Sequence, residues 1–247
     1  MCGIAGVFGR GDRSTVDAML AELYHRGPDD GFVVGGEHFT LGARRLSIVD
    51  LDGGRQPMSD ESGRIWAAQN GELYNAPRLR PRLLAGGHVL HTHCDTEVLP
   101  HLYQEFDTAV PEHIDGMFAV AIWDDVRQRG VLARDRMGKK PLYYHVTGDQ
   151  LYFASEIKSL LAIPGFSREL NLEALSHYLS LKHVPHPQSI FRGISIVPPA
   201  HRLVFEPGRL PRLERYWNVS YAPDPAAEAM SDDDAADELQ LLLNDGI

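Results

Sequence analysis

Short runs of alternating or continuous apolar residues recur along the chain and predict a structure rich in β-strands. The first strand is expected at Gly3 to Phe8, and the same patterns predict strands at 39–51, 65–68, 117–123, 130–133, 142–146, 151–154 and 201–205. A Thr-Gly-Asp-Gln turn at 147–150 predicts a hairpin. Because strands and helices do not alternate regularly, the pattern favours stacked, mostly antiparallel sheets over a parallel sheet.

Apolar residues at helical spacing flank these strands and predict helices at 15–24, 96–106, 155–162 and 172–181. Thr96 is the expected N-cap of the second helix. A shorter helix is predicted at 78–84, broken by Pro81 and closed by Gly86 and Gly87. The stretch His88 to Asp95 is predicted to be another strand. The predicted fold class is therefore α+β, with helices covering two stacked sheets.

The chain changes character after Trp217. Residues 222–234 are rich in Ala, Pro and Asp, which is typical of a linker. We therefore assign a domain to residues 2–217, a linker to 218–236 and the start of a further helix to 237–247. That helix carries leucines that need cover, so a further domain is expected to follow.

Composition excludes several classes of protein. The 247 residues are 43% hydrophobic and 23% charged, which is ordinary for a globular chain. A formal net charge of -10 argues against nucleic acid or an anionic membrane as the main partner. No apolar run approaches the roughly 20 residues of a membrane span. With two cysteines and no secretory leader, the sequence favours a cytoplasmic protein with reduced thiols.

The strongest candidate chemistry lies at Met1-Cys2-Gly3-Ile4. If Met1 is removed, Cys2 carries both a nucleophilic thiol and a free α-amine, whose ordinary pKa of about 7.7 to 8.0 suits a general base. Nucleophile and base on one terminal residue is an arrangement known from N-terminal threonine enzymes. The alternative is that Cys2 is only a small buried residue.

Two further stretches suggest a site for acyl transfer. The side-chain amide of Asn70 and the backbone N–H of Gly71 are donors that could stabilise an oxyanion, whereas the alternative for Asn-Gly is a hairpin turn. Arg44 and Arg45 follow one another in a predicted strand, so they point to opposite faces. The one that faces inward suits a carboxylate; the alternative is a surface pair.

Two polar segments, His25 to Gly31 and His88 to Asp95, carry further candidate site residues. The stretch His25 to Gly31 contains two glycines, a proline and two aspartates, so we expect an irregular loop that lines a site or simply makes a tight turn. The stretch from His88 to Asp95 crowds His, Cys and Asp together. It lacks a Cys-x-x-Cys or helical His pair, so we assign no metal there and expect Asp95 to end beside a ligand.

In these and other motifs the chain resembles the glutaminase domain of class II glutamine amidotransferases, most closely that of glutamine-hydrolysing asparagine synthetases. The resemblance covers about residues 2–217, and the loop His-Arg-Gly-Pro-Asp-Asp separates asparagine synthetases from relatives that form phosphoribosylamine or glucosamine. Its motifs are Cys2-Gly3-Ile4-Ala5-Gly6, the loop 25–31, Arg45-Leu46-Ser47-Ile48-Val49-Asp50, Gln56-Pro57-Met58, Asn70-Gly71-Glu72-Leu73-Tyr74-Asn75, Asp95-Thr96-Glu97 and 133–144.

The resemblance implies an N-terminal nucleophile hydrolase fold, with two antiparallel sheets between helix layers, and hydrolysis of L-glutamine to glutamate and ammonia. It implies these roles: Cys2 as nucleophile, Asn70 and Gly71 as oxyanion hole, Arg45 for the α-carboxylate, Asp95 and Glu72 for the α-amine, backbone around Ile48 and Val49 for the rest of the pocket, and Arg26 in support. It implies no metal and no cofactor in this chain.

It also implies a partner, because such enzymes use ATP and Mg²⁺ in a C-terminal synthetase domain with a Ser-Gly-Gly-x-Asp loop. No such loop occurs in these 247 residues. The strand 117–123 is a candidate wall for ammonia passage, or simply a core strand. The acceptor, chosen by the other domain, is aspartate or another carboxylate, and a homodimer stays open.

Two other classes of protein remain as alternatives. A glutamine-binding module without catalysis would be favoured by loss of Cys2 or Asn70, and neither is lost. Another terminal-nucleophile hydrolase would predict a cleavable propeptide before Cys2.

Overall fold

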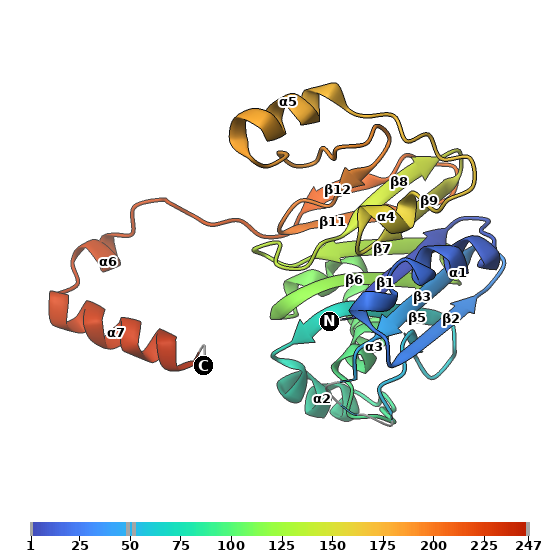
Figure 1. The fold of residues 1–247 in the computed structure, drawn as a ribbon. Coiled ribbons are helices and arrows are strands. Elements are labelled where there is room, and N and C mark those ends of the chain that lie inside the picture. The colour runs from blue at the N-terminus through green and yellow to red at the C-terminus, as the bar shows by residue number, and fades with distance from the viewer. Residues whose placement is uncertain (1, 48–49, 51–52, 246–247) are drawn as a thin grey trace. The chain divides into compact units, whose positions relative to one another are not determined.

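The computed structural model describes residues 2–47, 50 and 53–245. The chain divides into two compact units, Met1–Trp217 and Asn218–Ile247. The first unit contains two six-stranded sheets, and each pairing between their strands is antiparallel (Figure 1).

The first sheet has β9 and β1 at its centre. Its strand order is β10 (Ser195–Ile196), β8 (Tyr143–Thr147), β9 (Gln150–Ala154), β1 (Gly3–Phe8), β3 (Phe39–Arg45) and β2 (Asp30–Gly35). The second sheet has β6 and β7 at its centre. Its order is β12 (Arg212–Arg215), β11 (His201–Phe205), β7 (Arg129–Arg134), β6 (Gly116–Asp124), β5 (Ile65–Leu73) and β4 (Met58–Ser59).

Helices pack on the outer faces of both sheets. The first sheet packs against α1 (Arg13–Ala21) and α4 (Ile157–Leu160), and the second against α2 (Ala76–Ala85) and α3 (Val98–Phe106). The remaining helices of this unit are α5 (Leu172–Leu181) and the 3-10 turns Tyr24–Arg26, Asp95–Glu97 and Asp107–Glu112. Helix α2 continues through Pro81, contrary to the predicted break, because Leu79 and Leu83 on either side are buried in the core.

Strand β6 shows how the sequence specifies this layering. Phe118, Val120 and Ile122 face the helices α2 and α3, whereas the alternate residues lie between the sheets. Among the latter, the Trp123 ring stacks 5.4 Å from Phe8 and 5.6 Å from Phe39 of the other sheet. This confirms the predicted pair of antiparallel sheets between helix layers. Residues 118–123 are buried in the core, and the ammonia passage along this strand stays a prediction.

The segment 88–95 is not the predicted strand. The Glu97 carboxylate accepts hydrogen bonds from the backbone N–H groups of His91 and Thr92, at 2.6 and 3.0 Å, and the Asp50 carboxylate accepts one from that of His93 at 2.7 Å. These carboxylates therefore accept the backbone hydrogen bonds that carbonyl groups of a neighbouring strand would accept in a sheet. The predicted Thr96 cap is also wrong, since its hydroxyl makes no hydrogen bond to the described residues.

The second unit contains α6 (Pro225–Glu228) and α7 (Asp232–Asp245). Helix α7 begins within the predicted linker, five residues before position 237. The Ser231 hydroxyl accepts a hydrogen bond from the backbone N–H of Asp234 at 3.2 Å, and three aspartates in the first turn complement the helix dipole. These capping interactions account for the earlier start.

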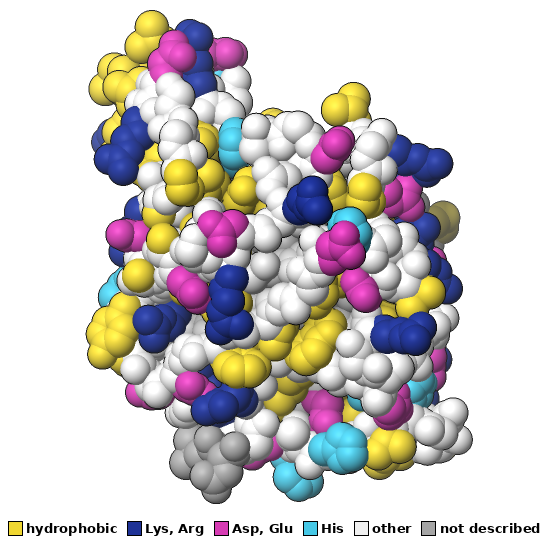
Figure 2. All heavy atoms as spheres, turned by 90° about the vertical axis from the view of Figure 1, so that its right-hand side faces the viewer, with side chains coloured by type: hydrophobic (Ala, Val, Ile, Leu, Met, Phe, Trp, Pro, Cys, Tyr) yellow, Lys and Arg dark blue, Asp and Glu magenta, His cyan; other side chains and the backbone are white. Residues whose placement is uncertain are grey.

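Acidic and basic side chains are interspersed over the face of the molecule in Figure 2, rather than gathered by sign. That distribution differs from the continuous basic stripe that nucleic-acid binding requires. Among the described helices, none is long and apolar enough to cross a membrane.

Candidate active site

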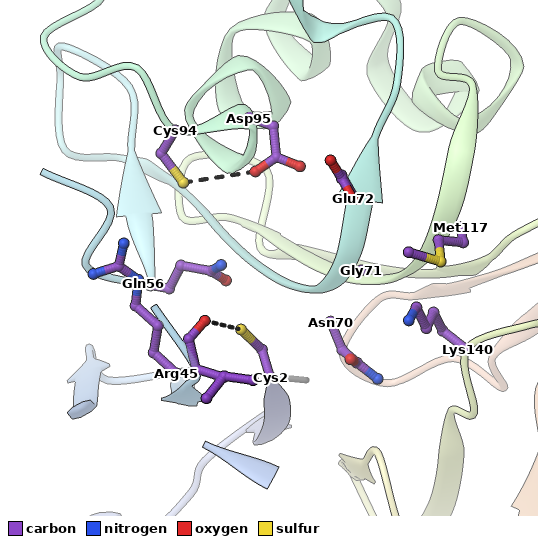
Figure 3. Close-up of a pocket in the computed structure, with 11 residues that line it drawn as sticks. Cys2, Arg45, Gln56, Asn70, Gly71, Glu72, Cys94, Asp95, Met117 and Lys140 are labelled. Carbon is purple, nitrogen blue, oxygen red and sulfur yellow. Dashed lines mark hydrogen bonds between the residues drawn. The ribbon is translucent and has the colours of Figure 1, made fainter. Parts of the chain in front are cut away.

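A cavity of about 100 Å³ lies where the two sheets meet, and it brings together six predicted site residues (Figure 3). Cys2 precedes β1 and Arg45 ends β3 in the first sheet, while β5 of the second sheet contributes Asn70. The complete lining is Cys2, Arg45, Leu46, Gln56, Asn70, Gly71, Glu72, Cys94, Asp95, Met117 and Lys140. The predicted contacts of Ile48 and Val49 lie outside the described residues.

The backbone of Cys2 is held by Arg26. The Arg26 Nε donates to the Cys2 carbonyl at 3.0 Å, and its second nitrogen donates to the Glu156 carboxylate at 2.8 Å. Although burial opposes it, the hydrogen bonds from Arg26 and His25 keep the pKa of Glu156 below its ordinary value. The Cys2 thiol itself contacts the Leu46 carbonyl at 3.8 Å. Arg26 thus lies behind Cys2 and does not line the cavity.

The predicted loop 25–31 is partly regular, which corrects the sequence interpretation. A 3-10 turn ends at Arg26 and β2 begins at Asp30. A Cβ on Gly27 would lie 2.4 Å from the backbone of Arg44 and Arg45, so the loop can pack tightly against the end of β3. Its contribution to the site is the Arg26 contact with Cys2.

Asn70 and Gly71 lie inside β5, paired with Ala119 and Phe118 of β6, so the hairpin alternative is wrong. Gly71 has φ +148°, and a Cβ there would lie 1.9 Å from the Met117 carbonyl oxygen. Asn70 is 0% exposed, and neither end of its side-chain amide has a hydrogen-bond partner among the described residues. A buried amide without a partner is costly, and one at the wall of a cavity can bind a ligand.

The two arginines at the end of β3 point to opposite faces, as predicted. The Arg44 guanidinium lies 5.3 Å from the centre of the Tyr24 ring. Arg45 is 7% exposed, lines the cavity and donates to the Asp50 carbonyl at 2.5 Å. The inward arginine therefore brings a fixed positive charge to the cavity.

Asp95 supplies a negative charge in the same cavity. One of its oxygens accepts hydrogen bonds from the Leu73 backbone N–H at 2.8 Å and from Gln69 Nε2 at 2.7 Å. The other oxygen accepts from the Cys94 thiol at 3.7 Å. Burial, with the nearby Asp95 charge, raises the pKa of the Cys94 thiol to about 11. Cys94 is thus a protonated donor at neutral pH.

Glu72 is exposed at the rim. Together with Asp95 it also lines an adjoining cavity of about 170 Å³. A positively charged ligand group bound at this edge would meet two carboxylates.

Five lining residues were given no role in glutamine binding or catalysis by the sequence interpretation, namely Leu46, Gln56, Cys94, Met117 and Lys140. Gln56 supports β5, because its side-chain oxygen accepts from the Gln69 backbone N–H at 2.7 Å. Lys140 is 6% exposed and lies near Asn70 and Met117 in Figure 3. Gln56 belongs to a motif that carried the resemblance, which could have drawn attention to it. Lys140 lies in the stretch 133–144, which also carried the resemblance, but no role was assigned to it there.

Comparison with known proteins identifies the family. A family model for the glutamine amidotransferase domain matches residues 1–217. Asparagine synthetase [glutamine-hydrolyzing] 3 of Bacillus subtilis is 38% identical over 255 residues, covering 100% of this chain and 41% of the relative. Asparagine synthetase [glutamine-hydrolyzing] 1 of the same organism is 36% identical, covering 90% and 36%. This chain therefore spans about two fifths of the length of these curated relatives.

A solved structure shows the same fold. The glutamine phosphoribosylpyrophosphate amidotransferase from B. subtilis superposes with a TM-score of 0.62 at 20% identity, covering 87% of this chain and 49% of the other. This likeness confirms the predicted N-terminal nucleophile hydrolase fold. Together with the match over residues 1–217, it shows that the chain belongs to the glutamine amidotransferase domain family.

Proposed function

We propose that this chain hydrolyses L-glutamine to glutamate and ammonia through a thioester on Cys2. The observation that carries the proposal is one cavity that joins the Cys2 thiol with the buried amide of Asn70, which has no hydrogen-bond partner within residues 2–47, 50 and 53–245. An amide donor without a protein partner is suited to a charge that appears only during reaction. Removal of residue 1 is part of the proposal, because it gives Cys2 a free α-amine.

In the proposed reaction, the α-amine of Cys2 accepts the thiol proton while the sulfur attacks the glutamine δ-carbon. The Asn70 amide and the Gly71 backbone N–H stabilise the oxyanion of the tetrahedral intermediate. The bond from carbon to nitrogen then breaks, and the α-amine returns the proton to the leaving ammonia. Water attacks the thioester, which releases glutamate and restores the thiol.

The charges in the cavity fit the head group of a zwitterionic amino acid. In this proposal Arg45 binds the α-carboxylate, and Asp95, with Glu72 at the rim, binds the α-amine; all three line the same cavity. The hydrogen bonds from Leu73 and Gln69 fix the Asp95 carboxylate before substrate arrives, so little side-chain conformational freedom is lost on binding. Substrates lacking either charged group should therefore bind weakly.

Replacing Arg45 with alanine should raise the KM for glutamine by about 10- to 150-fold and change kcat much less. This range corresponds to the loss of roughly 1.5 to 3 kcal/mol for a hydrogen bond to a charged group. The same guanidinium contacts the substrate before and during reaction, so the loss falls on binding. Steady-state ammonia release over a range of glutamine concentrations measures both constants.

Arg44→Ala is the matched control, since Arg44 packs on Tyr24 outside the cavity and its loss should leave KM within a few-fold. If the two substitutions raised KM equally, Arg45 would not be the residue that binds the α-carboxylate. Glutaramate, which lacks the α-amine, tests Asp95 in the same assay. Its use as readily as glutamine would mean that Asp95 does not recognise the amine.

The proposal extends to a partner that consumes the ammonia. The matched relatives are much longer than this chain and are named asparagine synthetases. A synthetase domain using ATP and Mg²⁺ to amidate aspartate is therefore the proposed partner. Helix α7 offers a contact surface, because its leucines 239, 241, 242 and 243 are 57% to 70% exposed. Two free cysteines fit the proposed cytoplasmic location.

The direct test is ammonia release from glutamine without ATP. Residues 1–247 should form equal amounts of glutamate and ammonia and no asparagine, and a chain ending at Trp217 should keep most of this activity. The reason is that every residue lining the cavity belongs to the first unit. Enzymatic assays for both products, with intact mass to verify Met1 removal, measure the outcome. ATP-dependent formation of asparagine by this chain alone would contradict the division of labour.

A further inference from the structure

A second cluster of reactive side chains lies outside the glutamine cavity. Glu61 comes from the turn between β4 and β5, His88 follows α2, and His101 lies on α3. One ligand atom from each lies within 4.8 Å of those from the other two. Helices α2 and α3 lie close together on the same sheet in Figure 1. Three segments distant in sequence thus converge on one point.

His101 is the strongest sign that this point holds a ligand. Its side chain is 1% exposed, and both ring nitrogens are buried without a hydrogen-bond partner among the described residues. A buried imidazole with no partner carries an uncompensated cost of desolvation.

The spacing of the three side chains fits a tetrahedral metal ion. Nδ1 of His101 lies 3.5 Å from Oε1 of Glu61, and Nδ1 of His88 lies 3.7 Å from the same oxygen. Metal–ligand bonds of about 2.0 to 2.2 Å place tetrahedral ligand atoms roughly 3.3 to 3.6 Å apart. The two distances to Glu61 are close to this spacing, and the third, between the two histidines, is at most 4.8 Å, so side-chain shifts of about 1 Å would close the three ligands around an ion.

The surroundings orient the ligands. Nε2 of His88 lies 3.5 Å from Oε1 of Glu105, the arrangement in which a carboxylate fixes the ring of a metal-binding histidine. Glu105 is itself paired with Arg82 at 3.1 Å. The Val89 backbone N–H donates to Oε1 of Glu61 at 2.6 Å, which positions that carboxylate. The two carboxylates also give the cluster a negative potential that attracts a cation.

We propose that Glu61, His88 and His101 bind one zinc-class divalent ion, with water as the fourth ligand. Two imidazoles and one carboxylate are ligands that suit zinc. The ion would cross-link three segments: the β4–β5 turn, the segment that follows α2, and helix α3. Because α3 follows directly after the 3-10 turn that contains Asp95, the ion would also stabilise the support of the glutamine cavity.

Zinc titration of the metal-stripped 247-residue chain tests the proposal. Competition against a chromophoric chelator should give one zinc per chain, and Co²⁺ should develop the visible absorption of a tetrahedral site. At a zinc concentration 100-fold above its Kd, the Tm should rise by roughly 5 to 10 °C. If the chain took no zinc from the chelator, the proposal would be overturned.

Variants locate the ion. His88→Ala and Glu61→Gln should each lose the bound zinc and the zinc-dependent rise in Tm. These are preferred to changes at fully buried His101, whose replacement also alters the core; Glu61→Gln keeps the shape of an accessible side chain. His38→Ala is the matched control, because His38 is a surface histidine that faces Glu37 at 3.9 Å. It should keep one zinc.

The two thiols need their own control. Cys2→Ala combined with Cys94→Ala should still bind one zinc through the proposed cluster. Loss of zinc from this double variant, with retention in His88→Ala, would place the ion in the glutamine cavity and overturn the proposal. These readouts do not depend on glutaminase activity, so they stand apart from the test of the proposed function.

Discussion

Replacing Cys2 with alanine should lower kcat for glutamine hydrolysis by about 10⁴-fold or more, because the thioester route is lost with its nucleophile. The Cys94 thiol lines the same cavity, yet it cannot substitute. Burial and the nearby Asp95 charge raise the pKa of Cys94 to about 11, so roughly one molecule in 10⁴ is a thiolate at pH 7. The two cysteines differ in reactivity because their surroundings differ.

Ammonia release and labelling by a glutamine analogue that carries an electrophile measure this effect together. Intact mass and peptide mapping should find one label per chain, on Cys2, and none in Cys2→Ala. Cys94→Ala is the comparison variant, and it should still be labelled once. Retention of normal glutaminase activity in Cys2→Ala would sink the assignment, and labelling that follows Cys94 would reverse the roles of the two thiols.

The layered fold could be predicted because burial alternates along individual strands. In β6, Phe118 and Val120 face helices while Ala119 and Trp123 face the other sheet, and a period of two is visible in the sequence. Helix α5 and strand β11 begin and end where predicted, at Leu172–Leu181 and His201–Phe205. Strand β2 was missed, since its Asp-Gly start continues a segment that has the composition of a loop.

The failures share a physical origin. The segment 88–95 has the composition of a strand, but the Glu97 carboxylate takes its backbone donors, and that contact depends on the tertiary fold. Asn70-Gly71 has the composition of a turn, but pairing with β6 keeps it extended. In both places, neighbours distant in sequence override the local preference.

The candidate site divides along the same line. Cys2 and the Asn70-Gly71 pair could be predicted because two or three adjacent residues are enough to indicate their chemistry. Lys140 lies in the motif 133–144, yet its place in the cavity could not be predicted, because that place depends on how a long polar loop folds. The proposed zinc cluster is the extreme case. The sequence interpretation sought ligands within 88–95, whereas only His88 of that segment belongs to the cluster and its partners are Glu61 and His101.

Replacing Asn70 with alanine should lower kcat by about 10² to 10³-fold and leave KM nearly unchanged. The oxyanion that the amide stabilises exists only after attack, so its loss raises the barrier without weakening substrate binding. The Tm should change little, because the Asn70 amide has no hydrogen-bond partner among the described residues to lose. Steady-state kinetics and thermal unfolding of the same preparation measure both quantities.

Asn75→Ala is the matched control, because Asn75 is also a buried asparagine but makes two hydrogen bonds and does not line the cavity. Its side chain donates to the His113 carbonyl at 3.0 Å and accepts from the Asp115 backbone N–H at 3.0 Å. Losing them should lower stability by about 1 to 3 kcal/mol while kcat stays within a few-fold. Asn70→Ala should thus lower turnover and leave stability nearly unchanged, whereas Asn75→Ala should lower stability and leave turnover nearly unchanged. If Asn70→Ala lowered the Tm as Asn75→Ala does and kept its turnover, Asn70 would be a structural residue and the oxyanion would require another donor.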